Sequence, residues 1–422
     1  MMAVTCAVAV PKPVTRVPTA SPVQRIEHLS ELSREVWTTR NGLPHNQVNA
    51  IEQTPDGYLW FATWEGVARY NGVRFRVFDR SNTPALADNG ARSLHVMRDG
   101  GVLIGTSRGG VTAVNAQGQW RSWRTAQGLI SDEVMSAIED RRGRIWVATE
   151  SAGVDRIDRR GVRHFGQADG LTSDVQFDLA EAVDGAIWVA SALGVARISD
   201  DGVETLRANE GLPKTNINDI RVASDGAIWV ATQVGGFVRR EGSDRFERIT
   251  PEDLHEVTTS VLPETANRAT FGTVNEGVVS VADGTLDRFR NLRTLPNNRI
   301  TALFRDREDS LWVGTSAGLM RMRDTPFSTW TTDHGLTDDY VRTMIESADG
   351  TLWIGTSRGL SAIPPGSLAP VSGTAGLPTE SILGLGPARD GGLWIGTYAD
   401  GLMHFRDGKV VRRWTESEGL AD

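Results

Sequence analysis

The chain has 422 residues, a formal net charge of −8, 39% hydrophobic residues and 23% charged residues. Such a composition can build a hydrophobic core. The negative net charge and the lack of any run of lysine and arginine argue against nucleic acid as the main partner. The single cysteine, Cys6, excludes an internal disulfide and a cysteine-rich metal site. The 45 glycines and 13 tryptophans suit an all-β protein with short strands.

Residues 1–35 form an N-terminal segment that precedes the repeats. Met1 to Val10 is mildly apolar, and Ala20-Ser21 resembles the end of a secretion signal. The segment lacks a basic start, however, and its apolar run ends at Pro11. Two interpretations stay open: a signal peptide, genuine or truncated, and an ordinary leading segment. No stretch of about 18 apolar residues occurs, so we expect no membrane span in this chain.

The first repeat unit predicts four strands joined by tight turns. Their expected ranges are 48–53, 58–63, 67–70 and 73–78. Asp56-Gly57 and Asn71-Gly72 separate two pairs of these strands, and both dipeptides are strong hairpin signals because they tolerate positive φ. In the second strand Trp60 and Ala62 alternate with Leu59 and Phe61. We therefore expect Trp60 and Ala62 to face one neighbouring sheet, and Leu59 and Phe61 the other.

This unit recurs down the chain nine times between residues 56 and 402, with the tryptophan position repeating every 41 to 43 residues. The position is filled by Trp60, Leu103, Trp146, Trp188, Trp229, Thr270, Trp312, Trp353 and Trp394. A period near 42 residues is that of a four-stranded β-propeller blade. The recurrence favours the tryptophans as core residues over platforms for sugar stacking.

Nine units exceed the four to eight blades of usual propellers, so we expect a boundary. The seventh unit carries Asp324-Thr325-Pro326 where the other units have a glycine turn, and proline is typical of a connection. An isolated strand at Glu35 to Thr38 could complete the sheet of that seventh unit. The sequence thus predicts a seven-bladed propeller over 36–324 and two blades of an incomplete second propeller over 325–422. Because the chain ends inside a linker, it is expected to be a fragment.

The sequence resembles the two-component regulator propeller repeats. The resemblance rests on Asp56 to Thr63, on Asp349 to Leu360, on Asp390 to Thr397 and on the linker Asn41 to Val48. It implies a periplasmic sensor region of a bacterial receptor, non-catalytic in itself. The output, a histidine kinase or a diguanylate cyclase, would lie in a domain absent from this chain, and a homodimer would form through the full-length receptor.

Ligand-binding residues are expected where the loops vary. We letter the four strands of each unit A to D in chain order. If strand A is innermost, the B-to-C loops and the D-to-A linkers open on one face, and this face carries the variable residues. Aromatic and hydrogen-bonding side chains there could hold a small molecule such as a carbohydrate at the central mouth. The candidates are Trp64, Glu65, His45, Asn46, Arg108, Glu150, Gln233 and Glu276. Trp64 is the strongest candidate for ligand binding because the repeat gives it no structural role.

No catalytic, cofactor or metal motif is found in the sequence. Gly105 to Gly109 and two later segments match G-x-S-x-G, but each spans a strand-to-strand turn and follows the repeat. The histidines lack ligand spacing. The acidic run Asp306 to Asp309 is expected to be solvated turn charge. Two alternatives stay open: a propeller-fold lyase or hydrolase acting on polysaccharide, and a protein-interaction scaffold.

Overall fold

The computed structural model describes residues 29, 32–206, 211–252, 254–290, 295–324, 330–332, 335–365, 371–372 and 380–420. Residues 1–28, on which the signal-peptide question depends, lie outside the described residues, as does Pro326. Among the described residues there is no helix long and apolar enough to cross a membrane.

The described chain forms nine antiparallel sheets of four strands each, as the repeat predicts. We number the sheets in chain order and call their strands A to D from the first to the outermost. Sheet 1 consists of β2 (Val48–Gln53), β3 (Leu59–Thr63), β4 (Gly66–Tyr70) and β5 (Phe75–Phe78). Sheet 2 consists of β6 (Ala91–Val96), β7 (Val102–Thr106), β8 (Val111–Val114) and β9 (Trp120–Trp123). Sheet 3 consists of β10 (Val134–Glu139), β11 (Ile145–Thr149), β12 (Val154–Asp158) and β13 (Gly161–Phe165).

The next three sheets repeat the same order. Sheet 4 consists of β14 (Gln176–Glu181), β15 (Ile187–Ser191), β16 (Gly194–Ser199) and β17 (Gly202–Leu206). Sheet 5 consists of β18 (Ile217–Val222), β19 (Ile228–Thr232), β20 (Gly235–Arg239) and β21 (Glu247–Arg248). Sheet 6 consists of β22 (Thr258–Thr265), β23 (Arg268–Thr273), β24 (Val278–Ala282) and β25 (Thr285–Phe289).

Sheet 7 is assembled from both ends of the first 324 residues. It consists of β26 (Ile300–Arg305), β27 (Leu311–Thr315), β28 (Leu319–Arg323) and the N-terminal β1 (Ser33–Trp37). The two remaining sheets follow in chain order. Sheet 8 consists of β29 (Val341–Glu346), β30 (Leu352–Thr356), β31 (Gly359–Ile363) and β32 (Val371–Ser372). Sheet 9 consists of β33 (Ile382–Pro387), β34 (Leu393–Thr397), β35 (Leu402–Arg406) and β36 (Lys409–Trp414).

Short 3₁₀ helices lie in the linkers that lead from strand D of one sheet to strand A of the next. Those described are η1 (Thr39–Asn41), η2 (Thr125–Gln127), η3 (Gln167–Asp169) and η6 (Glu416–Glu418). Each ends at a glycine with φ near 100°, a conformation that side chains with a Cβ rarely adopt. The linker glycine, such as Gly42 in the segment Asn41 to Val48, is therefore the end of a 3₁₀ turn.

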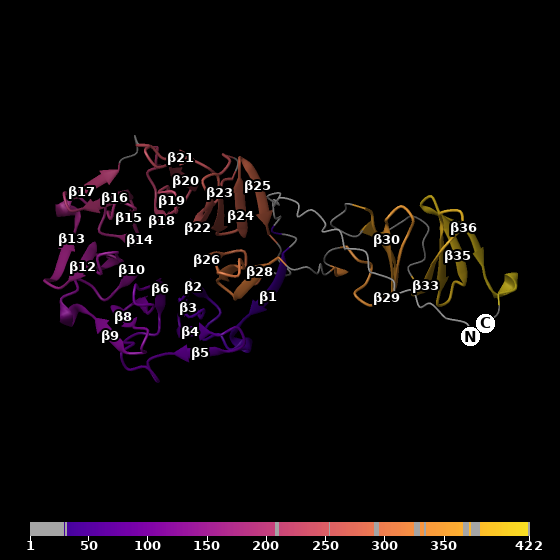
Figure 1. Ribbon diagram of the computed structural model, residues 1–422, viewed down its shortest axis with the longest axis horizontal. Coiled ribbons are helices and arrows are strands. Elements are labelled where there is room, and N and C mark those ends of the chain that lie inside the picture. The colour runs from indigo at the N-terminus through magenta and orange to yellow at the C-terminus, as the bar shows by residue number, and fades with distance from the viewer. Residues whose placement is uncertain are drawn as a thin grey trace, which may run out of the picture.

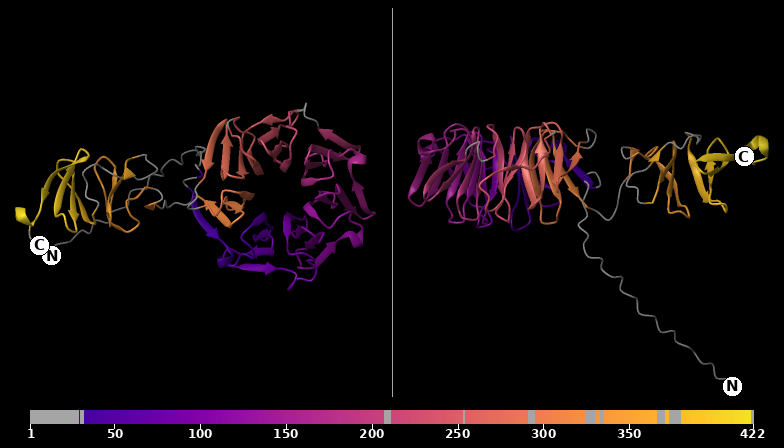
Figure 2. Two further views of the ribbon diagram at one scale, coloured as in Figure 1. Left: turned by 180° about the vertical axis from the view of Figure 1, so that it is seen from behind. Right: turned by 90° about the horizontal axis from the view of Figure 1, so that it is seen from above.

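The A strands of sheets 1 to 7 contact one another in a closed cycle that ends with β26 against β2. Figure 1 shows these sheets arranged around a ring, and Figure 2 shows the ring from behind and from above. Two sets of contacts close the ring, one at its outer strand and one at its inner strands. β1 pairs with β28 over Ser33–Trp37, the pairing expected for the isolated N-terminal strand, and the Trp37 ring stacks on Trp312 with ring centroids 5.3 Å apart. At the inner strands, Thr301 Oγ1 donates to Val48 O at 2.5 Å.

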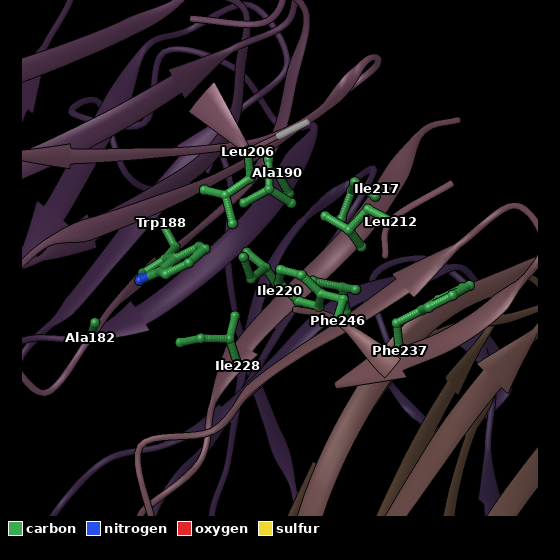
Figure 3. Packing of buried hydrophobic residues seen from close by; sticks show 12 residues of the cluster. Ala182, Trp188, Ala190, Leu206, Leu212, Ile217, Ile220, Ile228, Phe237 and Phe246 are labelled. Atoms are coloured by element: carbon green, nitrogen blue, oxygen red, sulfur yellow. The ribbon is translucent and has the colours of Figure 1, made fainter. Parts of the chain in front are cut away.

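The core lies between neighbouring sheets, where strand B alternates as expected. Leu59 and Phe61 pack towards sheet 7, whereas Trp60 and Ala62 pack towards sheet 2. Figure 3 shows one such layer between sheets 4 and 5, built around Trp188 and its neighbours on both sheets. Burial of these apolar surfaces is the main stabilising contribution, at about 25 cal/mol per Å².

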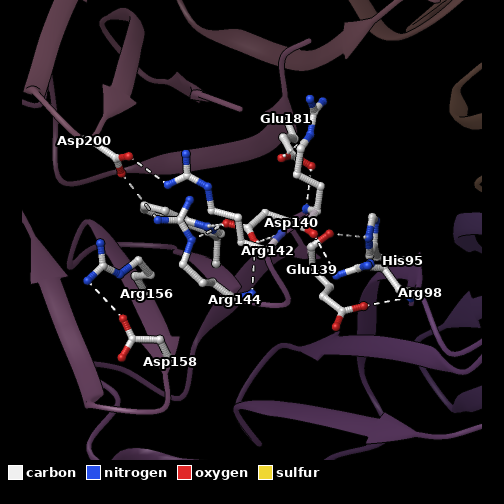
Figure 4. Close-up of polar contacts among 12 residues, drawn as sticks. His95, Arg98, Glu139, Asp140, Arg142, Arg144, Arg156, Asp158, Glu181 and Asp200 are labelled. Atoms are coloured by element: carbon white, nitrogen blue, oxygen red, sulfur yellow. Dashed lines mark hydrogen bonds and ion pairs between the residues drawn. The ribbon is translucent and has the colours of Figure 1, made fainter. Parts of the chain in front are cut away.

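Polar contacts tie the sheets together on the face formed by the A-to-B and C-to-D turns, which we call the turn face. Figure 4 shows these contacts for sheets 2 to 4. Glu139 Oε2 accepts from the backbone N of Arg98 in the preceding sheet, and Glu181 accepts in the same way from Arg141. These contacts fix the relative position of neighbouring sheets.

Within sheet 3, the buried Asp140 accepts from Trp146 Nε1 at 2.8 Å and from Arg144. Asp306 takes the same position in sheet 7 and accepts from Trp312 Nε1 at 2.7 Å. The expectation that Asp306 is solvated turn charge is therefore wrong. Its carboxylate is buried because it satisfies the indole N–H of the repeat's tryptophan.

Candidate functional site

The B-to-C loops and the D-to-A linkers lie together at one end of the sheets, as the strand order predicts; we call this end the loop face. Backbone hydrogen bonds join the two kinds of loop. Gly66 N, where a B-to-C loop enters β4, donates to Asn89 O in a linker, and Glu150 N donates to Glu133 O. These B-to-C loops are thereby held against linkers, which fixes the positions of the side chains that they carry.

The second residue of each A strand has a special position on this face. The register of strands A and B shifts there, between Val48 and Ala50 in sheet 1 for example, so this residue is left out of the ladder as a β-bulge. In four of the seven ring sheets its side chain hydrogen-bonds the first carbonyl of the next A strand. These residues are Asn49, Asn218, Thr259 and Thr301. They clasp neighbouring sheets together at the central mouth.

Sheets 2, 3 and 4 carry Arg92, Met135 and Phe177 at this bulge position instead. Methionine and phenylalanine cannot donate the clasping hydrogen bond. One arc of the mouth thus presents large side chains where the rest of the ring uses short polar ones, which makes this arc the candidate ligand site.

Arg92 is the centre of the site. Its Cζ lies 5.7 Å from the centroid of the Trp64 ring, in cation–π geometry. Its Nη1 lies 2.6 Å from Glu150 Oε2 and 2.7 Å from Met135 Sδ. We call Trp64, Arg92, Met135 and Glu150 the mouth cluster; they come from three consecutive sheets. Trp64 and Glu150 are sequence candidates, and the structure joins them through Arg92, which the sequence analysis missed.

The mouth cluster combines the features needed to hold a polar ring-shaped ligand. Trp64 is half-buried, whereas the Glu150 side chain is 48% exposed. An aromatic face, a guanidinium fork and a carboxylate can together offer stacking, donors and acceptors to hydroxyl groups. The Arg92–Glu150 ion pair holds the two charged groups in place without a ligand.

His45 and Asn46 are engaged in local contacts. His45 Nδ1 accepts from Gln47 N at 3.0 Å. Asn46 Oδ1 accepts from Thr39 N at 2.8 Å and so fastens the first residue of η1. Asp132 and Asp174 make the same contact in their own linkers. The Asn46 side chain is therefore already used by a recurring linker structure.

Among the described residues, no hydrogen bond or ion pair joins the other sequence candidates to the mouth cluster, although Glu65 directly follows Trp64 in the chain. Glu65 accepts from Asn89 at 3.4 Å, and Arg108 is exposed, with its backbone N donating to Asp88. Gln233 accepts from Thr215, and Glu276 pairs with Arg290 at 3.0 Å. These four candidates thus each have a hydrogen-bond or ion-pair partner outside the mouth cluster.

The A strands carry a second group of charges that face the interior of the ring. Burial raises the pKa of Glu52 to about 7, although the positive charge of Arg221 opposes this shift. Burial also raises the pKa of Asp219 to about 7, against the effect of Arg221, whose Nε lies 3.2 Å from Asp219 Oδ1. The pKa of His95 is lowered by burial. Protein surrounds these groups, yet half of the Arg221 side chain stays exposed to the solvent inside the ring.

Neither group of residues resembles a metal or nucleophile site. In the described part of the chain, no three His, Cys, Asp or Glu side chains are placed to hold a metal ion. Ser107, from the first G-x-S-x-G match, lies in a turn between β7 and β8 and donates to Asp88 at 2.6 Å. A serine-hydrolase nucleophile would need a strand-turn-helix elbow, which is not present at this turn.

A family model, described as two component regulator propeller, matches residues 42–65, 128–151, 294–317 and 335–358. The chain contains two component regulator propeller repeats. Three of the matched segments begin at the linker glycine and the fourth begins at Thr294; all four run through strands A and B to the B-to-C loop. The first matched segment includes Trp64 and the second includes Glu150, whereas Arg92 lies in a repeat unit that the family model does not match.

Two solved structures similar to this regulator propeller chain are extracellular domains from B. thetaiotaomicron. One, from the proposed hybrid two component system BT3049, is 22% identical with a TM-score of 0.74; the similarity covers 91% of this chain and 54% of that one. The other, from BT4673, is 16% identical with a TM-score of 0.57 and coverages of 90% and 53%. This chain therefore spans about half the length of these two structures.

A third similar structure is a lyase, which shows that the fold also occurs in enzymes. It is a catalytically inactive virginiamycin B lyase from Staphylococcus aureus, 12% identical, with a TM-score of 0.58 and coverages of 70% and 100%. No curated protein sequence matches the chain. At these sequence identities, the similarity of this chain to the three structures shows only a shared fold. Its function must therefore be argued from the site.

Proposed function

We propose that this chain is the ligand-sensing region of a bacterial signal-transduction receptor and that it binds a small polar ligand at the mouth cluster. The observation that carries the proposal is the contact of Trp64 and Glu150 with Arg92 at the one arc of the mouth that lacks the clasping side chains. The extracellular domains of hybrid two component systems among the similar structures support a signalling role. The ligand class that we favour is a carbohydrate, because a half-buried tryptophan beside charged hydrogen-bonding groups suits a sugar ring.

We further propose that residues 36–324 form a seven-bladed propeller and that residues 325–422 form two blades of a second one. The closed cycle of A strands in sheets 1 to 7 supports the first part. Sheet 8 supports the second, because its Val341 and Met344 are 41% and 62% exposed, whereas the equivalent Val48 and Ile51 in sheet 1 are 0% and 5% exposed. A face that is buried in the ring is thus uncovered in sheet 8.

The signalling output, a diguanylate cyclase or a histidine kinase, would belong to another part of the receptor, which would act as a homodimer. The chain would reside in the periplasm. Fusion of alkaline phosphatase to the chain, behind its own N-terminus, tests the location: periplasmic fusions are active and cytoplasmic fusions are not.

An enzyme acting on polysaccharide is the second candidate, because a lyase is among the similar structures. A lyase site would need a general acid or base with a free ring nitrogen or carboxylate on the loop face. At the mouth cluster the Glu150 carboxylate is paired with Arg92, and His45 Nδ1 is engaged by Gln47. Incubation with polysaccharides, followed by detection of new reducing or unsaturated ends, separates an enzyme from a sensor.

A thermal-shift screen of the 422-residue chain against sugars and polar metabolites tests the sensor proposal. We expect at least one compound to raise the melting temperature of the wild type but not that of Trp64→Ala. The matched control is Tyr398→Ala, because Tyr398 follows the B-strand threonine of sheet 9 as Trp64 does in sheet 1, and it is 78% exposed. A compound that stabilises Trp64→Ala as strongly as the wild type would contradict the proposed site.

A further inference from the structure

A cleft of about 390 Å³ lies on the outer rim between sheets 1 and 2, away from the mouth cluster. It is lined by the D strand of sheet 1, by the linker into sheet 2 and by Trp120, with these residues: Arg76, Val77, Phe78, Asn82, Thr83, Pro84, Ala85 and Trp120. A smaller cavity shares Arg76, Phe78 and Trp120 with it and reaches Asp56 and Arg69 on the turn face. The two cavities are thus adjacent, and we call them together the rim groove.

The rim groove exists because the linker into sheet 2 departs from the repeat. In sheet 1 the glycine that ends η1, Gly42, lies against Phe75, the first residue of strand D; a Cβ on Gly42 would be 3.5 Å from the Phe75 ring. Gly128 covers Val162 in the same way in sheet 3. The linker into sheet 2, residues 79–90, has no 3₁₀ helix, so Trp120 at the equivalent position lines an open cleft instead.

The charges in the rim groove are unbalanced. Arg69 and Arg76 lie directly opposite each other on β4 and β5, and like charges at opposite positions repel. Within the described residues, neither guanidinium has a carboxylate within ion-pair distance. Arg76 lies 5.0 Å from the Phe78 centroid, and Arg69 lies 4.3 Å from that of Tyr58. Asp56, the one acidic lining residue, accepts from Thr54 Oγ1 at 2.6 Å.

The equivalent groove between sheets 4 and 5 shows the balanced arrangement. There Arg197 takes the position of Arg69, and Glu204 lies opposite it in place of Arg76. Arg197 pairs with Glu204 at 3.7 Å and with Asp184 at 2.6 Å. Sheet 3 also places two arginines, Arg156 and Arg163, opposite each other, but there Arg156 pairs with Asp158 at 3.0 Å. Arginines without a carboxylate partner are therefore not required by the repeat.

We propose that the rim groove is a second binding site, for an organic anion whose carboxylate is attached to a ring. Arg76 and Arg69 would hold the carboxylate through their guanidinium forks, and the ring would pack on Phe78 and Trp120. Arginine suits this role because its planar donors match the two oxygens of a carboxylate. The aromatic walls serve equally for the apolar face of a sugar acid and for an aromatic acid, so both are tested.

The test is calorimetric titration of the whole chain, with tryptophan fluorescence as a second readout because Trp60 and Trp120 line the groove. The probes are glucuronate and benzoate, each paired with its neutral analogue, glucose and benzamide. We expect at least one of the two acids to bind at millimolar concentration or below, and neither neutral analogue to bind comparably. Binding by glucuronate alone identifies a sugar acid, and binding by benzoate alone identifies an aromatic acid.

Arg76→Gln should weaken binding of that acid about tenfold or more, the usual effect of losing a charge-assisted contact. The matched control is Arg163→Gln, since Arg163 lies over Phe165 at 4.5 Å at the same repeat position in sheet 3. Arg76 is exposed, so its replacement leaves the fold intact. Failure of both acids to bind, equal binding of the neutral analogues, or unchanged affinity in Arg76→Gln would each overturn the proposal.

Discussion

Arg92 Nη1 lies 2.6 Å from Glu150 Oε2, although the two residues are 58 positions apart and belong to different sheets. Their side chains are 20% and 48% exposed, so the ion pair contributes at most about 1 kcal/mol to the free energy of unfolding. We therefore expect Arg92→Gln to leave the melting temperature nearly unchanged while it removes the stabilisation by a ligand of the mouth cluster. Thermal-shift measurements with and without that ligand check this.

The control for Arg92→Gln is Arg121→Gln, which replaces an arginine on the outermost strand of sheet 2 that stacks on Trp123. Arg121→Gln should keep the full response to the ligand. If Arg92→Gln kept it as well, Arg92 would have no part in binding.

Closure of the ring by β1 predicts a second outcome. Trp37 stacks on Trp312 at 5.3 Å and belongs to the strand that completes sheet 7. Trp37→Ala should lower the free energy of unfolding of the ring by roughly 3 kcal/mol, as measured by denaturant titration. Trp414→Ala removes a similar D-strand tryptophan, which packs on Trp394 in sheet 9, and should leave the transition of the ring unchanged. Equal effects of both variants on that transition would argue against closure through β1.

The buried charges inside the ring predict a pH dependence. The pKa of Glu52 is raised by burial from 4.5 to about 7, so between these values the folded protein keeps a proton that the unfolded chain releases. The free energy of unfolding therefore falls as the pH rises through this range. Because solvent reaches the interior of the ring, we expect Glu52 to account for roughly 1–2 kcal/mol of that fall.

Glu52→Gln should remove this part of the pH dependence, so the variant gains stability over the wild type as the pH rises from about 5 to about 8. Denaturant titrations at both pH values measure the gain. Glu346→Gln is the control, because Glu346 is an exposed glutamate in sheet 8. A gain that is the same at both pH values would mean that Glu52 titrates normally.

The uncovered face of sheet 8 predicts opposite effects at equivalent positions. Met344 is 62% exposed and Ile51 is 5% exposed, although both are the fourth residue of an A strand. Met344→Glu should change the free energy of unfolding by less than about 0.5 kcal/mol, whereas Ile51→Glu buries a charge and should prevent the ring from folding. Circular dichroism and thermal unfolding of both variants check this. A strongly destabilised Met344→Glu would show that the face is covered in solution.

The period of the tryptophans and the hairpin turns predict the four-stranded sheets from sequence, because these features are local. The same local signals miss contacts made by residues far apart in the chain. Arg92 has no motif around it, and it stands out only when the equivalent bulge positions of other sheets are seen to carry short clasping residues such as Asn49 and Thr301. The acidic turn predicts a solvated Asp306, yet Asp306 Oδ2 is buried and accepts a hydrogen bond from Trp312 Nε1.

Hydrogen–deuterium exchange of the 422-residue chain, with and without the ligand found by thermal shift, tests the central claim most directly. Ligand binding at the mouth cluster should slow the exchange of peptides spanning residues 62–66, 89–94 and 132–136, which carry Trp64, Arg92 and Met135. The turn-face peptides 97–101 and 140–144 should exchange as before. Protection confined to the turn face, or none on the loop face, would contradict a sensor that binds its ligand at this mouth.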